Sequence, residues 1–317
     1  MPSRQGRARV AFLFPGQGSQ HPGMGAEAAA AFHEARAVFD AADAALGFAL
    51  SKLCFEGPEE SLRQTENTQP AILTVSSALD AVLEKQCPRP YCVAGHSLGE
   101  YSALVAAGAL ALEDAVVLVR KRGHYMQQAV PVGEGAMAAV LGVTPEEIEA
   151  LCAEASNGRI VEAANFNGAG QIVIAGHRDA VERASELARR KGKRAVALPV
   201  SAPFHCRLME PAAAALREAL AGVTFSDLRV SLFTNVDARP ITRADEAREA
   251  LIRQVASPVR WEESVRAMAA EGVTVFVEVG PGKVLSGLAR KIVPGARVLS
   301  VSSPEDVDRF VREVELV

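Results

Sequence analysis

The sequence contains few cysteines, and their positions predict neither a metal site nor a disulfide framework. None belongs to a CxxC pair, and none has histidines nearby at the spacing of a zinc site. An odd number of cysteines does not suit a closed set of disulfides, so a reducing compartment is expected. We therefore expect a cytoplasmic protein without a bound metal; the cysteines are Cys54, Cys87, Cys92, Cys152 and Cys206.

The sequence also lacks an excess of positive charge and a long hydrophobic run. Its formal net charge is -4, which argues against nucleic acid as a partner. The most apolar stretch, residues 103–119, is interrupted by Glu113 and Asp114, so no membrane span is expected. The basic first residues are followed by an apolar run, residues 10–14, that is too short for a signal peptide.

Hydrophobic residues make up 49% of the 317 residues, which is enough for a large buried core. Residues 10–14 read as a buried strand that enters the glycine loop Pro15-Gly-Gln-Gly18. Helical patterns follow over residues 25–46 and 68–84, and residues 91–94 form a short apolar run before Gly95-His-Ser-Leu-Gly99 and another helical pattern. Strand, tight turn and helix in this order are typical of an α/β fold.

The middle of the chain has a different order of predicted strands and helices. Strand patterns at residues 136–143, 160–165, 171–175 and 195–200 alternate with helix patterns at residues 145–155 and 179–191. This β-α-β-β-α-β order predicts a ferredoxin-like unit. We expect it at residues 133–201, inserted into a discontinuous α/β domain of residues 1–132 and 202–317. The larger domain should resume with strands at residues 230–235 and 273–279 and a helix at residues 245–254.

Ser97 lies in a G-x-S-x-G pattern, Gly95-His-Ser-Leu-Gly99, between an apolar strand and a helix. This context is typical of an elbow that exposes a nucleophilic serine. The alternative is a serine that only caps the following helix. Because the elbow serine is also located at the helix start, the sequence permits both roles.

A nucleophilic serine needs a base, and His205 is the leading candidate among six histidines. His205 follows a loop where the chain leaves the predicted small domain, and ligand sites favour such seams. His96 adjoins Ser97 and should point away from it. The alternative for His205 is a buried, hydrogen-bonded histidine. Asp114 and Asp179 both resemble helix-start residues, so we expect a dyad whose imidazole is oriented by a carbonyl or an amide.

Arg122 interrupts an otherwise apolar helical face over residues 115–129. A buried guanidinium must find an anion because it cannot lose its proton. The anion is either an internal carboxylate or the carboxylate of a substrate held in two parallel hydrogen bonds. The loop Pro15-Gly-Gln-Gly-Ser-Gln20 fits neither dinucleotide nor P-loop patterns, so its N–H groups are free to face an oxyanion.

Several motifs taken together resemble the malonyl-CoA:acyl carrier protein transacylases of fatty-acid synthesis, and polyketide-synthase acyltransferase domains share them. The resemblance spans essentially the whole chain and implies an α/β-hydrolase-like large domain with a ferredoxin-like insertion. The motifs are Phe12-Leu-Phe-Pro-Gly-Gln-Gly-Ser-Gln20, Gly95-His-Ser-Leu-Gly-Glu-Tyr101, Arg120-Lys-Arg-Gly123, Ala202-Pro-Phe-His205, Arg253-Gln254 and Glu278-Val-Gly-Pro-Gly-Lys-Val-Leu285.

The resemblance implies roles for individual residues. Ser97 corresponds to the family nucleophile and His205 to its general base. The backbone N–H groups of Gln17 and Leu98 correspond to the oxyanion hole. Gln254 corresponds to the amide position that orients the histidine.

Further residues correspond to the acyl pocket. Arg122 is expected to bind the malonyl carboxylate, with Met126 on the same helical face, and Asn165 corresponds to a position near the thioester arm. Phe204 departs from many bacterial members, which carry a serine there. In polyketide domains, phenylalanine at this position goes with malonyl and a small residue with methylmalonyl.

The resemblance also implies the reaction and its partners. Malonyl-CoA donates the acyl group in a ping-pong cycle, and the phosphopantetheine thiol of an acyl carrier protein accepts it, with no resident cofactor and a monomeric enzyme. The basic stretch Arg189-Arg-Lys-Gly-Lys-Arg194 is a candidate docking surface for the acidic carrier, or a solvated helix end. The alternatives are a trans-acting polyketide-synthase acyltransferase, a serine thioesterase or acyl hydrolase, and a non-catalytic docking module.

Overall fold

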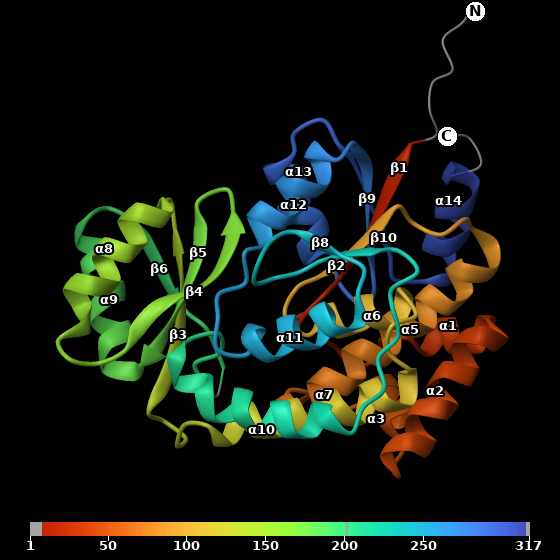
Figure 1. The fold of residues 1–317 in the computed structure, drawn as a ribbon, viewed down its shortest axis with the longest axis horizontal. Coiled ribbons are helices and arrows are strands. Elements are labelled where there is room, and N and C mark those ends of the chain that lie inside the picture. The colour runs from red at the N-terminus through yellow and green to blue at the C-terminus, as the bar shows by residue number, and fades with distance from the viewer. Residues whose placement is uncertain (1–7, 201, 315–317) are drawn as a thin grey trace, which may run out of the picture.

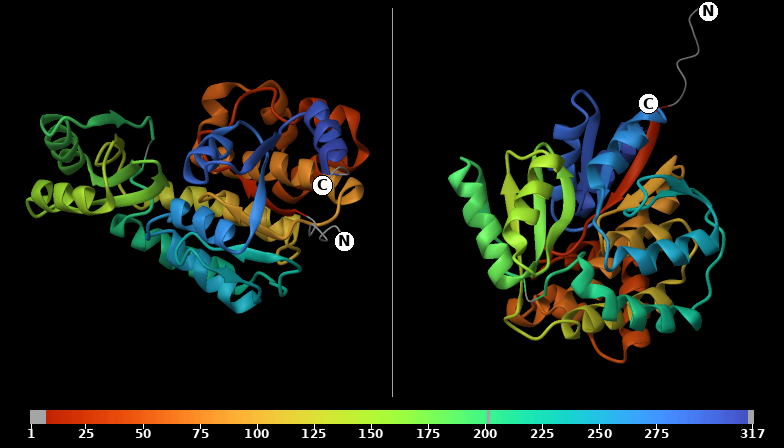
Figure 2. Two further views of the ribbon diagram at one scale, coloured as in Figure 1. Left: turned by 90° about the horizontal axis from the view of Figure 1, so that it is seen from above. Right: turned by 60° about the vertical axis from the view of Figure 1, so that its left-hand side comes forward.

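A computed structural model describes residues 8–200 and 202–314; residues 1–7, 201 and 315–317 lie outside the described part. The chain forms two lobes, each built on its own β-sheet (Figure 1). The larger lobe holds a six-stranded sheet in the order β10-β9-β1-β2-β7-β8, and the smaller one a four-stranded sheet in the order β4-β5-β3-β6. Seen from above, the small lobe projects from one side of the large lobe (Figure 2).

The large sheet is parallel except for its last pair, β7 and β8. Its central strand β1 pairs with β2 on one side and β9 on the other. Parallel strands of this kind are covered by helices on both faces. The strands are β1 Arg9–Phe14, β2 Cys92–Gly95, β7 Ser231–Phe233, β8 Pro240–Ile241, β9 Val273–Val279 and β10 Arg297–Val301.

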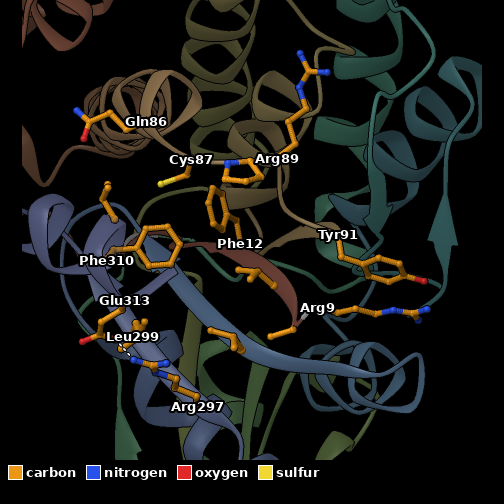
Figure 3. Close-up of a pocket in the computed structure, with 15 residues that line it drawn as sticks. Arg9, Phe12, Gln86, Cys87, Arg89, Tyr91, Arg297, Leu299, Phe310 and Glu313 are labelled. Atoms are coloured by element: carbon orange, nitrogen blue, oxygen red, sulfur yellow. Dashed lines mark hydrogen bonds and ion pairs between the residues drawn. The ribbon is translucent and has the colours of Figure 1, made fainter. Parts of the chain in front are cut away.

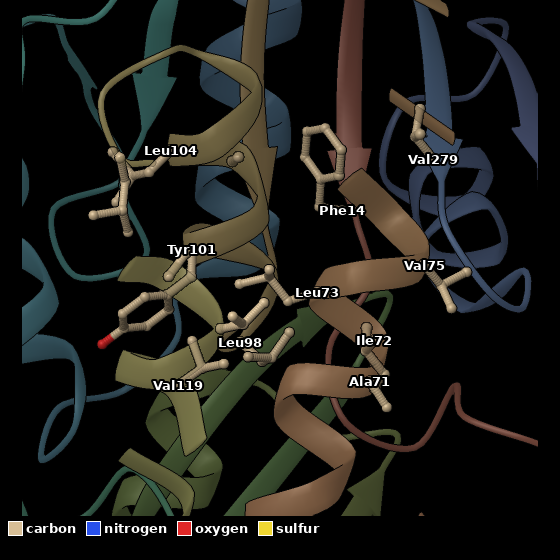
Figure 4. Packing of buried hydrophobic residues seen from close by; sticks show 14 of the residues in the cluster. Phe14, Ala71, Ile72, Leu73, Val75, Leu98, Tyr101, Leu104, Val119 and Val279 are labelled. Carbon is tan, nitrogen blue, oxygen red and sulfur yellow. The ribbon is translucent and has the colours of Figure 1, made fainter. Parts of the chain in front are cut away.

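Side chains that alternate along β1 enter two separate cores, because successive residues of a strand point to opposite faces. Phe12 and Phe14 pack with the helices of one face, whereas Ala11 and Leu13 pack on the other face with α12 (Trp261–Ala270) and α13 (Val284–Ile292). Figure 4 shows Phe14 near Leu73, a residue of the helix Thr65–Gln86.

The helices of the large lobe come from both sides of the inserted segment. Those before it are α1 Ala26–Ala31, α2 His33–Leu46, α3 Leu50–Glu56, α4 Glu59–Leu62, α5 Thr65–Gln86, α6 Gly99–Ala106 and α7 Leu112–Gln128. Those after it are the short 3-10 helix η1 Arg207–Met209 and α10 Glu210–Ala221, α11 Ala244–Gln254, α12 Trp261–Ala270, α13 Val284–Ile292 and α14 Pro304–Val314.

The small lobe confirms the predicted ferredoxin-like order. Two helices pack on an antiparallel sheet, and together they enclose a third hydrophobic core. Helix α8 begins with a capping box between Thr144 and Glu147, and Pro145 occupies its first turn. The elements are β3 Gly135–Leu141, α8 Pro145–Ser156, β4 Val161–Gly168, β5 Gln171–His177, α9 Arg178–Arg190 and β6 Arg194–Ala197. The exact boundaries at residues 133 and 201 stay predictions.

Strand β4 joins the small lobe to the segment before α12. The backbone N–H of Phe166 donates to the carbonyl of Val259 at 2.9 Å, and the N–H of Val259 donates to the carbonyl of Ala164 at 2.9 Å. Asn165 lies between them and forms a parallel bridge with Val259. The lobes therefore meet through backbone hydrogen bonds close to the predicted site.

Some predicted elements differ from the structure. The helix expected over residues 25–46 is broken at Phe32, whose extended backbone (φ -125°, ψ 127°) lets its ring pack against the main core. Strand β6 ends at Ala197, three residues early, and β7 covers only Ser231–Phe233 of the strand expected at residues 230–235. Among the described helices, none has both the length and the apolar character needed to cross a membrane.

Candidate active site

Ser97 lies at the carboxyl end of β2, next to the carboxyl end of β1, where open α/β sheets bind ligands. Its φ of 52° is a strained value for a residue with a side chain. The flanking glycines are required by space: a Cβ on Gly95 would lie 1.9 Å from the carbonyl of Gly99, and one on Gly99 would lie 2.0 Å from the carbonyl oxygen of Phe14. The G-x-S-x-G pattern is therefore a steric requirement of this turn.

Replacing Gly99 with alanine is expected to lower the free energy of unfolding by about 1–3 kcal/mol or more, because the new methyl group would overlap a backbone carbonyl. Gly287→Ala is the matched control, since a Cβ there meets nothing within 4 Å. Gly287 lies inside helix α13, so alanine should stabilise that helix by roughly 0.5–1 kcal/mol. Denaturant unfolding of both variants measures the difference, and equal stability would contradict the steric argument.

The glycine loop before α1 lies directly against the elbow. A Cβ on Gly16 would lie 2.4 Å from the carbonyl oxygen of His96. Within the described residues, the backbone N–H groups of neighbouring Gln17 and of Leu98 have no hydrogen-bond acceptor. Two such donors beside a nucleophile suit a developing oxyanion.

His205 lies against the serine. Its Nε2 is 2.7 Å from Ser97 Oγ, and its Nδ1 is 2.9 Å from the backbone carbonyl oxygen of Gln254. Burial, reinforced by the positive charge of Arg122, lowers the pKa of His205 to about 3. The imidazole is therefore neutral near pH 7, as a group that must accept the serine proton has to be.

Among the residues that the structure describes, none is an acidic partner of His205. Asp114 and Asp179 lie in the first turns of α7 and α9, as the sequence predicts, and the carbonyl of Gln254 holds the Nδ1–H instead. Gln254 is thus the residue that contacts the imidazole, as the resemblance implies, and it does so through its backbone carbonyl and not through its side-chain amide. His96 points away from the nucleophile, as expected, and its Nε2 lies 2.8 Å from Asn167 Oδ1 on β4.

The side chain of Gln254 has another set of partners. Its Nε2 donates to the carbonyl of Ser97 at 2.9 Å and to Glu100 Oε2 at 2.7 Å, while its Oε1 accepts from Arg122 Nη2 at 2.8 Å. Asn235 completes this network, since its Oδ1 accepts from the N–H of Ser97 at 2.7 Å. The amide of Gln254 thus connects the elbow to the guanidinium.

Arg122 on α7 is 1% exposed and lies beside Ser97. Nη1 donates to Gln69 Oε1 at 2.8 Å, and Nη2 donates to Ser97 Oγ at 3.2 Å as well as to Gln254. These bonds occupy three of the five N–H groups of a guanidinium, and Nε has no partner among the described residues. No carboxylate of the described chain lies within 4 Å, so the internal ion pair considered above is absent.

The remaining predicted residues surround this centre less directly. Met126 is buried one turn beyond Arg122, with its sulfur 3.9 Å from the Nε2 of Gln69. Phe204 is 8% exposed and packs in the main core beside His205. Asn165 is buried at the seam between the lobes.

Sequence reasoning missed Gln69, Glu100 and Asn235. Glu100 lies within the quoted motif Gly95-His-Ser-Leu-Gly-Glu-Tyr101, but a glutamate in a first helical turn is ordinarily exposed. Asn235 lies just beyond strand β7, and a polar residue at a strand's carboxyl end was the available signal. Gln69 lies inside α5 and carries no comparable signal.

A cavity of about 560 Å³ opens at the opposite edge of the large sheet, where β1, β9 and β10 begin (Figure 3). None of the predicted site residues lines it. Its arginines already have partners: Arg9 donates to the carbonyl of Glu271, Arg89 pairs with Glu84, and Arg297 pairs with Glu313. This cavity is therefore separate from the cluster of Ser97, His205 and Arg122.

The sequence matches the family described as "Acyl transferase domain" over residues 11–315. It is 49% identical to a malonyl CoA-acyl carrier protein transacylase of Bacillus subtilis, over 97% of this chain and 98% of that protein. It is 50% identical to the Escherichia coli K12 protein of the same name, over 93% of this chain and 96% of that one.

Solved structures agree with the sequence comparison. The malonyl CoA-acyl carrier protein transacylase of Coxiella burnetii superposes with a TM-score of 0.95 at 44% identity, over 97% of this chain and 98% of that one. A malonyl-transacylase solved in complex with its type II PKS acyl-carrier protein has a TM-score of 0.94 at 43% identity, over 96% of this chain and 100% of that one. The chain therefore belongs to the acyltransferase family, and within it to the malonyl CoA-acyl carrier protein transacylases.

Proposed function

We propose that this protein transfers a malonyl group from malonyl-CoA to the phosphopantetheine thiol of an acyl carrier protein, through an ester on Ser97. The observation that carries the proposal is Arg122, a buried cation 3.2 Å from the nucleophilic oxygen with no carboxylate partner in the described chain. A buried guanidinium that bonds no carboxylate directly is costly, although Glu100 lies one side chain away, beyond Gln254. A substrate carboxylate at this position would compensate it.

In the first half-reaction, His205 Nε2 takes the proton of Ser97 as Oγ attacks the malonyl thioester carbon. The N–H groups of Gln17 and Leu98 stabilise the tetrahedral oxyanion. The C–S bond then breaks, and the imidazolium returns the proton to the departing CoA thiolate. In the second half-reaction, the carrier thiol gives its proton to His205 and attacks the ester, and Ser97 recovers the proton as it leaves. The cycle needs no resident cofactor or metal.

Mass measurement after incubation with malonyl-CoA, with and without holo acyl carrier protein, tests the proposal. We expect a malonyl-enzyme that persists without the carrier and is discharged onto it when the carrier is added. A serine thioesterase would instead release free malonate without any carrier. A non-catalytic docking module would gain no mass at all.

The proposal also includes a surface of this protein on which the acyl carrier protein docks. The stretch Arg189–Arg194 is a weaker candidate than its sequence suggests, since Arg189 and Arg190 pair with Glu186, Lys191 with Glu154 and Lys193 with Glu147. These exposed pairs contribute little stability, so carboxylates of an acidic carrier could replace these glutamates as partners of the basic side chains. Charge reversal at Arg194, which forms no ion pair within the described part of the chain, should raise the KM for the carrier and leave the KM for malonyl-CoA unchanged.

Phe204→Ser is expected to narrow the preference for malonyl-CoA over methylmalonyl-CoA. If the ring limits space near the α-carbon, admitting a methyl branch costs about 1–3 kcal/mol, or roughly tenfold or more in selectivity. The kcat/KM ratio for the two donors measures it, with Phe204→Leu as a control that keeps most of the volume. An unchanged ratio with lowered stability would show that Phe204 only packs the core.

A further inference from the structure

A buried carboxyl group is connected to the backbone of Ser97 through the Gln254 side chain. Glu100, in the first turn of α6, is fully buried. Its Oε2 accepts hydrogen bonds from Gln254 Nε2 at 2.7 Å and from the backbone N–H of Asn235 at 3.2 Å. Its Oε1 has no partner among the described residues. Nothing in the cycle above uses this group.

Glu100 is linked to Arg122 by a single side chain. Gln254 Nε2 donates to Glu100, and Gln254 Oε1 accepts from Arg122 Nη2 at 2.8 Å. A carboxylate can only accept hydrogen bonds, so it holds the amide with its NH₂ toward Glu100 and its oxygen toward Arg122. Glu100 therefore acts on Arg122 through the amide as well as through its charge.

The charges near Glu100 sum to zero only while it is ionised. Arg122 is the cation of this buried site, and the neighbouring Asp237 and Arg253 neutralise each other across 2.6 Å. His205 is neutral, and burial raises the pKa of Tyr101, so that its phenol also stays neutral. A malonyl carboxylate on Arg122 would leave two carboxylates sharing one guanidinium.

We propose that Glu100 is the buried counter-charge of Arg122 and takes up a proton when a carboxylate-bearing acyl group binds Arg122. Glu100 is then a positioning residue that contributes to acyl specificity. This inference rests on the proposed function. Burial is the main reason that the pKa of Glu100 lies at about 7 in the free protein. A small further rise in this pKa is therefore enough to protonate Glu100 near neutral pH.

The sign of the pH dependence follows from linkage. Binding of the acyl carboxylate raises the pKa of Glu100, so binding takes up a proton and weakens as pH rises above the pKa of the free protein. A neutral acetyl group brings no second negative charge, so its binding leaves the pKa of Glu100 unchanged. The ratio of kcat/KM for malonyl-CoA to that for acetyl-CoA should therefore fall about tenfold between pH 6 and pH 8.

Proton uptake during acylation tests this directly in the wild-type protein. Transfer of an acyl group from CoA to Ser97 releases CoA thiol and consumes no net proton. A pH indicator in weak buffer near pH 7.5 should therefore report about half to one proton taken up per malonyl-enzyme, after subtraction of the same reaction with acetyl-CoA. Acylation confirmed by mass but without this uptake would overturn the inference. Absence of acylation would instead overturn the proposed function.

Two variants test the assignment to Glu100. Glu100→Gln should make the malonyl-to-acetyl ratio of kcat/KM independent of pH and abolish the extra proton uptake. Glu100→Asp, which keeps a carboxyl group, should retain both. A ratio that still falls with pH in Glu100→Gln would overturn the assignment, and the wild-type measurement stands even if a variant fails to fold.

Discussion

Ser97→Ala is expected to abolish formation of the malonyl-enzyme and to lower the transfer rate by at least about a thousandfold, because it removes the attacking oxygen. The elbow itself should survive, since alanine differs from serine only by the atom that contacts His205 at 2.7 Å. Intact mass after incubation with malonyl-CoA measures the effect.

Ser102→Ala is the matched control. Ser102 lies on the helix that follows the elbow, is 1% exposed, and its Oγ has no hydrogen-bond partner in the described chain. Loss of this hydroxyl should leave acylation unchanged. If Ser97→Ala still gains the malonyl mass, the nucleophile lies elsewhere.

Arg122→Ala is expected to lower kcat/KM for malonyl-CoA by about 30-fold to several thousandfold, since truncating one partner of a buried charge pair costs ~2–5 kcal/mol. Acetyl-CoA should suffer much less, because it brings no carboxylate. Arg122→Lys should restore little malonyl activity, as an ammonium group cannot reproduce the planar fork.

The control for this series is Arg120→Ala, on the same helix. The central carbon of the Arg120 guanidinium lies 4.4 Å from the centroid of the Phe48 ring. Arg120 is therefore an arginine of the same helix that packs on an aromatic ring. Its loss should affect both donors equally. If the Arg122 variants also lose both donors to the same extent, Arg122 supports the local structure and does not select the acyl group.

The residues that the sequence identified are those whose chemistry depends on residue type. Ser97, His205 and Arg122 are conspicuous because a serine in a tight turn, a histidine at a domain seam and an arginine on an apolar face each require an explanation. The structure brings the first two within 2.7 Å although 108 positions separate them. Strand and helix patterns also predicted the ferredoxin-like insertion, since its helices have one apolar face and its strands are short apolar runs between turns.

What the sequence could not predict depends on backbone geometry and on the orientation of amides. The carbonyl of Gln254 that holds His205 is a group that every residue possesses, so no residue type signals it. The roles of Gln69 and Asn235 depend on which way their amides face. The break at Phe32 arises because tertiary packing of its ring overrides a helical pattern.

The backbone carbonyl that orients His205 has a consequence for tolerance to mutation. Position 254 performs two separable tasks, one encoded by its side chain and one by its main chain. A substitution there can change how Arg122 is held, yet the chain always retains an acceptor for the imidazole. In a triad, by contrast, a single codon change can delete the acid. Substitutions at position 254 can therefore change acyl selectivity, while the backbone hydrogen bond that orients His205 is kept.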